Sequence, residues 1–125
     1  MIRYEKDEYL EKIVKCIIDS LEMNYIEKSN VYVVKSHNSK TKAIARIYSV
    51  PSAIRFALGM EPIYVIEFIS EKFDRLSFED KIKVIIHELL HIPSSFTGGL
   101  RPHGKIVNNR AVNNLFKKID LKKCT

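Results

Sequence analysis

Hydrophobic residues recur at helical spacing in three stretches of the chain. In residues 4–27 apolar side chains return at three- and four-residue steps, which predicts an amphipathic helix with one buried face. A second periodic stretch follows Ser77, a good helix-capping residue, with Asp80 placed near the exposed amides. A third stretch covers residues 106–119. The pattern therefore predicts an N-terminal, a central and a C-terminal helix.

Three shorter stretches are rich in β-branched and aromatic residues, as strands are. They cover residues 31–34, 43–50 and 63–69. A turn cluster at residues 36–40 lies between the first two, which we therefore expect to form an antiparallel hairpin. Pro51 and Gly59 fit the start and the end of a short helix. The predicted fold class is α+β, with a mixed or antiparallel sheet of about three strands packed against the three longer helices.

Length and composition limit the class of protein. We expect the 125 residues to form one domain, residues 1–125. With 46% hydrophobic and 29% charged residues the chain is not of a disordered type. A charged N-terminus and short apolar runs argue against a signal peptide and a membrane span, so a cytoplasmic location is expected. Cys16 and Cys124 lack metal-ligand spacing and are expected to be free thiols in a reducing compartment.

Positive charge is concentrated in two parts of the chain, which carries a net charge of +6. Residues 31–59 contain five cations and no acid, and residues 105–125 contain six cations and one acid. Such segments can contact nucleic acid or an acidic partner. Because lysine-rich surfaces are more often simply solvated, nucleic acid is a possible partner but not the favoured one.

The sequence His-Glu-Leu-Leu-His at residues 87–91 carries the candidate chemistry. On a helix, residues four apart lie on one side, so His87 and His91 can bind the same metal ion. Glu88 lies where it can act on water beside the metal as a general base. The apolar positions of this helix fall on another face, and Pro93 should end it just after the second histidine. The histidines should therefore face a cleft.

A third ligand is expected from His103, which lies twelve residues after His91 in a turn rich in Gly and Pro. Three neutral imidazoles with an open fourth position suit zinc, so we expect one Zn²⁺ per chain. Other residues remain as alternatives for the third position: His37, Glu67, Glu71 and Asp74.

Arg101, two residues before His103, is a candidate catalytic residue. Its guanidinium could stabilise an oxyanion or bind a substrate carboxylate, or it could instead tie its loop to a nearby acid. Tyr48 and Tyr64 are possible oxyanion donors, although packing is the favoured role for both. If residues 63–69 form an edge strand, an extended peptide could pair with it beside the metal.

Three segments together resemble a zincin-like metallopeptidase family of archaea and phages: residues 63–77, HELLHIP at 87–93 and FTGGLRPHG at 96–104. The resemblance implies a zincin-like fold, metal-ligand roles for His87, His91 and His103, and the base role for Glu88. The twelve-residue gap before the third histidine differs from the six of metzincins, and neither a Met-turn nor the downstream glutamate of thermolysin-like enzymes is recognisable. No substrate preference of those two groups is therefore implied.

The function expected from the sequence is zinc-dependent hydrolysis of peptide bonds in a peptide or protein substrate, with Glu88 as general base. One alternative is a zinc-dependent endoribonuclease that also uses three histidines, but such an enzyme has glycine where this chain has Glu88. The other alternative is a non-enzymatic, basic module that binds nucleic acid or protein.

Overall fold

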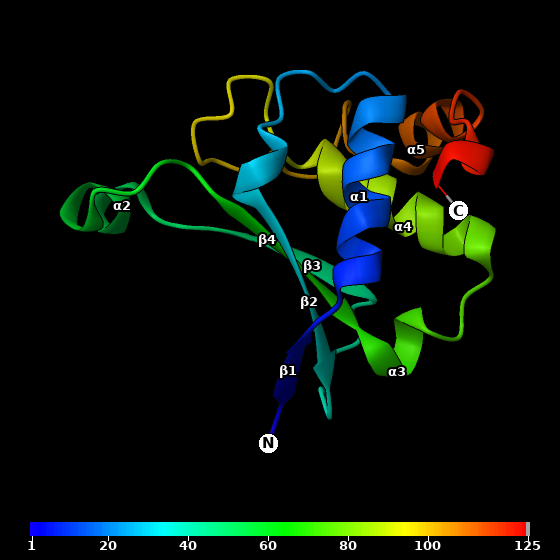
Figure 1. The fold of residues 1–125 in the computed structure, drawn as a ribbon, viewed down its shortest axis with the longest axis horizontal. Helices are drawn as coiled ribbons and strands as arrows, with labels where there is room; N and C mark the ends of the chain where they lie inside the picture. The colour runs from blue at the N-terminus through cyan, green and yellow to red at the C-terminus, as the bar shows by residue number, and fades with distance from the viewer. Residues whose placement is uncertain (125) are drawn as a thin grey trace.

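The fold is a four-stranded mixed sheet with helices packed on one face, as seen in a computed structural model that describes residues 1–124 (Figure 1). The strands are β1 Arg3–Lys6, β2 Val31–His37, β3 Ala45–Ser49 and β4 Tyr64–Ile69. The helices are α1 Glu8–Ser20, α2 Ser52–Leu58, α3 Ser70–Phe73, α4 Phe78–Leu90 and α5 Asn109–Phe116, with 3₁₀ turns η1 Lys28–Asn30 and η2 Leu121–Cys124. The predicted α+β class is confirmed, with one strand more than expected.

The strand order is β1-β2-β4-β3. β2 pairs with β4 in parallel, whereas β1 and β3 pair antiparallel with their neighbours. The predicted hairpin of residues 31–34 and 43–50 is therefore wrong, because β4 lies between these strands. The nearly continuous apolar run of β4 suits a central strand, and Tyr64, Ile66 and Phe68 are fully buried. The edge position considered for residues 63–69 belongs instead to β3.

The first predicted helix is in fact a strand followed by a helix. β1 pairs with the end of β2, and Asp7 then caps α1 by accepting a hydrogen bond from the Leu10 amide (2.9 Å). The short strand is exposed along its whole length and mostly polar, so it has no hydrophobic pattern that sequence analysis could detect. The helix itself buries the apolar face that was predicted, including Val14 and Ile17.

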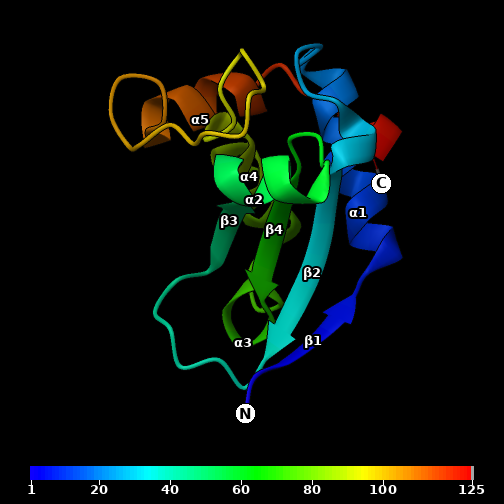
Figure 2. The same cartoon turned by 90° about the vertical axis from the view of Figure 1, so that its left-hand side faces the viewer.

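α1 and α4 pack on the same face of the sheet, and the other face is not covered by these helices (Figures 1 and 2). α4 begins where the sequence predicts, because the Ser77 side chain accepts a hydrogen bond from the Asp80 amide (3.2 Å). It ends at Leu90, three residues before Pro93. Among residues 1–124, no helix combines the length and the apolar character needed to cross a membrane.

α2 lies on an arm that projects away from the sheet (Figure 1). Its helix ends at Gly59 in the left-handed conformation (φ 66°), as predicted. Phe56, near the end of the arm, is 90% exposed. At the arm's base, the Arg55 guanidinium donates to the Val50 carbonyl (3.1 Å) and so ties the helix to the end of β3.

Cys16 and Cys124 form a disulfide bond, so the expectation of two free thiols is wrong. The C-terminal turn η2 packs back against α1 and brings the two Cα atoms to 5.6 Å, a normal disulfide separation. A separation of 108 residues gives no sign of this pairing in the sequence. The preceding helix α5 is shorter than the predicted 106–119, because Asn108 caps it by accepting from the Ala111 amide (2.8 Å).

Candidate metal centre

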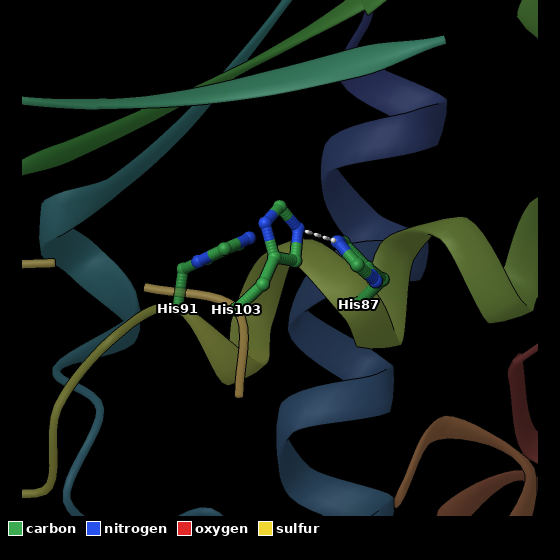
Figure 3. Close-up of side chains that lie close together, drawn as sticks. All are labelled: His87, His91 and His103. Carbon is green, nitrogen blue, oxygen red and sulfur yellow. Dashed lines mark hydrogen bonds between the residues drawn. The ribbon is translucent and has the colours of Figure 1, made fainter. Parts of the chain in front are cut away.

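The side chains of His87, His91 and His103 converge (Figure 3). The Nε2 atoms of His87 and His103 are 3.0 Å apart, and one ligand atom from each of the three residues lies within 4.8 Å of the others. Tetrahedral zinc with Zn–N bonds of 2.0–2.1 Å separates its nitrogen ligands by roughly 3.3 Å. The three imidazoles therefore fit a single divalent ion with only small side-chain movements.

α4 holds the first two histidines. Four of its apolar side chains are at most 1% exposed and fix the helix against the core: Ile82, Ile85, Ile86 and Leu89. With that face buried, His87 and His91 are turned to the opposite side, and their ring centroids are 5.2 Å apart. The predicted placement of these two side chains follows directly from helical geometry.

The third histidine is held by a loop that follows α4. The Arg101 amide donates to the His91 carbonyl (2.7 Å), which joins the loop to the end of the helix. Beyond His103, the Asn108 side chain donates to the carbonyls of Gly104 (2.7 Å) and Lys105 (3.1 Å). These bonds fix the backbone on both sides of His103, which lies outside the helices and strands and forms an isolated β-bridge with Val107.

The backbone of Arg101 also orients His91. The Nδ1 atom of His91 lies 2.5 Å from the Arg101 carbonyl oxygen. Because a carbonyl can only accept, Nδ1 must carry the proton and donate it. The lone pair of a neutral His91 is then on Nε2, the tautomer that a metal ligand requires. This arrangement is a second sign, besides the distances, that the residues suit a metal ion.

Burial controls the charges of the centre. It lowers the pKa of His87, and the neighbouring His91 and His103 lower it further, which favours the neutral imidazole that a metal ligand needs. Glu88 is only 5% exposed, and its burial raises the pKa of the carboxyl to about 7. A cation held by the histidines would favour the ionised form of this carboxyl. Burial and a bound cation therefore act in opposite directions on the pKa of Glu88.

A cleft of about 1080 Å³ opens beside the histidines. Its walls are β3, α4, the loop before His103, and α5. Glu88 and Arg101 line it together with apolar side chains such as Ile47, Val84 and Val112. The free edge of the sheet, at β3, therefore borders the same space as the candidate metal ligands.

The alternative third ligands are engaged elsewhere. His37 contacts Glu5 (2.6 Å), and Asp74 pairs with Lys35 (2.8 Å). Glu71 accepts from the Asn38 amide (3.3 Å), and Glu67 accepts from the Tyr48 hydroxyl (2.6 Å). Within residues 1–124, the three histidines are the one His, Cys, Asp or Glu cluster with metal-binding geometry.

The proposed oxyanion donors are placed differently from one another. Arg101 lines the cleft, its Nη1 lies 3.4 Å from the Leu90 carbonyl, and no ion pair joins it to an acid in residues 1–124. The Tyr48 hydroxyl is directed to Glu67, and burial together with this carboxylate raises its pKa to about 12. Tyr64 is fully buried, and its hydroxyl donates to the Gly99 carbonyl (2.9 Å). Arg101 alone of the three therefore remains a candidate.

The residues that hold the loop with His103 were not predicted from the sequence. Asn108 could have been recognised, because asparagine just before a helical stretch is a frequent N-cap. The contact of Tyr64 with Gly99 spans 35 residues, and that of Arg55 with Thr97 spans 42, so neither has a local signal.

A small α+β domain with a three-histidine centre beside a buried glutamate has the features of a metal-dependent hydrolase. The chain belongs to the family described as Putative phage metallopeptidase, whose model matches residues 2–120. This match confirms the resemblance found in the sequence. A metallopeptidase family implies a metal, and the histidine cluster could hold one. No curated protein and no solved structure matches the chain.

Proposed function

We propose that the protein is a zinc-dependent peptidase whose ligands are His87, His91 and His103. The observation that carries this proposal is the convergence of the three imidazoles beside the buried carboxyl of Glu88 in one cleft. A set of three neutral nitrogen ligands is typical of catalytic zinc sites. Zinc held there supplies Lewis-acid polarisation and lowers the pKa of water to about 7.

Glu88 is the general base in this proposal. Its carboxylate takes a proton from the attacking water and returns it to the amine that leaves when the peptide bond breaks. A pKa near the working pH allows both transfers, and burial has moved the Glu88 pKa in that direction. Arg101, at the rim of the same cleft, is placed to stabilise the oxyanion or to bind a substrate carboxylate.

β3 provides an alignment surface for the substrate. It is an edge strand, paired on one side with β4 and bordering the cleft with residues 45–48. An extended peptide can add to such an edge through main-chain hydrogen bonds, which places its backbone across the cleft. The apolar walls at Ile47, Val84 and Val112 suit an apolar substrate side chain.

The charge distribution also favours a peptide over a nucleic acid. Of the five cations in residues 31–59, two lie beside carboxylates and a third donates to a backbone carbonyl. Lys35 pairs with Asp74 (2.8 Å), Arg46 contacts Glu67 (3.4 Å), and Arg55 donates to the Thr97 carbonyl (3.0 Å). This part of the chain therefore presents less positive charge to a phosphate backbone than its composition suggests.

The experiment is a cleavage assay on zinc-loaded protein with pooled peptides of random sequence, read by mass spectrometry. We expect Glu88→Gln to lose activity by at least about a hundredfold, because a general base contributes 10²–10⁴ in rate, while zinc content stays at one per chain. Glu79→Gln is the matched control, since Glu79 is exposed on the same helix and pairs only weakly with Lys83 (3.9 Å). Cleavage of labelled RNA in place of peptides, or no cleavage of any peptide by zinc-loaded wild type, would contradict the proposal.

A further inference from the structure

The hydroxyl of Tyr64 joins the central strand β4 to residues 98 and 99 of the loop that carries His103. Tyr64 is the first residue of β4, is fully buried, and packs edge-on against Phe96 (centroids 5.1 Å apart). Its oxygen accepts a hydrogen bond from the Gly98 amide (3.0 Å) and donates one to the Gly99 carbonyl (2.9 Å). One hydroxyl therefore satisfies two neighbouring backbone groups of the loop, in opposite senses.

The bonds to Tyr64 lie close in sequence to the metal centre. Gly99 precedes Arg101 by two residues, and Arg101 precedes His103 by two. Both backbone groups of Arg101 are bound to His91, the amide to its carbonyl (2.7 Å) and the carbonyl to its Nδ1 (2.5 Å). A movement of Gly99 would therefore shift His91 through the hydrogen bonds of Arg101, and His103 through the chain itself.

The same loop segment is held from a second side by Arg55. Its Nη2 donates to the Thr97 carbonyl (3.0 Å), and the guanidinium lies against Gly98. A Cβ on Gly98 would come within 2.7 Å of Nη2, and the φ of +100° is one that L side chains rarely adopt. Residues 97–99 therefore lie between Arg55 and Tyr64, and hydrogen bonds to both side chains hold their backbone.

We propose that Tyr64 is a positioning residue of the metal centre. Its hydroxyl holds the loop of residues 97–103 in place, so that His103 and His91 can bind the same metal ion. The proposal rests on the metal site of the proposed function, but not on peptide hydrolysis. A ligand on an unrestrained loop must lose conformational freedom when the ion binds, and this loss weakens the affinity. Contacts that order the loop beforehand remove that cost, as outer contacts of metal sites commonly do.

The test is the zinc affinity of Tyr64→Phe, measured by competition with a chromogenic chelator at one pH and well below the unfolding temperature. Phenylalanine keeps the buried ring and removes only the hydroxyl. We expect the affinity to fall about tenfold or more, within the range for outer contacts of metal sites. Tyr32→Phe is the control, because it removes a tyrosine hydroxyl from the neighbouring strand β2, at a residue that does not line the cleft. Its affinity should stay within about threefold of wild type.

A double-mutant cycle distinguishes positioning from a general loss of structure. In a His103→Ala background only the path through Arg101 to His91 remains, so we expect Tyr64→Phe to weaken zinc binding by a clearly smaller factor there. An equal factor in both backgrounds, or no loss in Tyr64→Phe alone, would overturn the proposal. Because zinc affinity is the readout, a zinc-loaded wild type that cleaves no peptide would refute the proposed function and leave this result standing.

Discussion

The candidate metal centre takes its ligands from two regions that are held in different ways. His87 lies on α4 and His91 caps its C-terminal end, and the position of this helix depends on a face of fully buried isoleucine and leucine side chains. His103 belongs to a loop held by individual hydrogen bonds from Tyr64, Arg55 and Asn108. Each such bond contributes about 1 kcal/mol, whereas the helix shares the stability of the whole core. The helical half of the centre, His87 and His91, should therefore lose its geometry only when the domain unfolds. The loop half, His103, can be displaced while the domain stays folded.

The largest effect should come from removing a ligand in either half. We expect His87→Ala and His103→Ala each to weaken zinc binding by on the order of a thousandfold, beyond the 10–100-fold of outer contacts. Zinc content after dialysis without chelator is the first measurement, and chelator competition gives the factor. His37→Ala is the control, since His37 contacts Glu5 and lies outside the cluster. Full zinc retention in His103→Ala would exclude the loop from the centre.

A cavity made in the buried face of α4 should lower the stability of the whole domain but leave the zinc affinity of the folded protein nearly unchanged. Ile86 is a fully buried side chain of α4, directly before His87, and Ile86→Ala should lower the free energy of unfolding by about 3 to 4 kcal/mol. Urea unfolding of the zinc-free protein measures this loss. The zinc affinity of the molecules that remain folded should stay within about threefold. A much larger loss of zinc affinity without unfolding would show that α4 can deform locally while the rest of the domain stays folded. The difference between the helix and the loop would then be wrong.

The buried base adds a pH dependence to the helical half. Because the folded-state pKa of Glu88 is raised from 4.5 to about 7, the folded protein binds this proton more tightly than the unfolded chain. Its contribution to stability is complete below pH 4.5 and is lost as the pH rises through about 7. In the zinc-free protein this loss should amount to about 3 kcal/mol. Urea unfolding across this range compares wild type with Glu88→Gln, where the loss should be absent. Parallel curves would contradict the shift.

The smallest effect should come from a single methyl group in the loop half. Gly98→Ala should weaken zinc binding about tenfold, because the added Cβ meets Arg55 and the backbone is left-handed there. Thermal unfolding should change by only a few degrees, on the order of 1 kcal/mol. Gly99→Ala is a close control, since nothing lies within 4 Å of its added Cβ and its φ is not positive. Equal zinc affinities in the two variants would show that the backbone conformation of Gly98 and its contact with Arg55 do not position the loop.

The same contrast explains what the sequence could predict. His87, Glu88 and His91 follow from a spacing within one helix, and the cap at Ser77 is a local signal. His103 is predicted as the third ligand because few histidines are available, but the contacts that hold it in place join residues more than 30 apart in sequence. The hairpin failed for a related reason. Alternation identifies strands, but it does not say which strand lies between two others.

The disulfide between Cys16 and Cys124 turns most of the chain into a closed covalent ring. A single cut of the backbone anywhere between these residues opens the ring but does not divide the molecule. The exposed arm at α2 lies inside this ring, as do α4 and the loop with His103. If the protein nicks itself or is nicked in the arm, both pieces stay joined until a reductant opens the Cys16–Cys124 bond. Migration as a single band in a non-reducing denaturing gel is therefore no evidence of an unbroken chain.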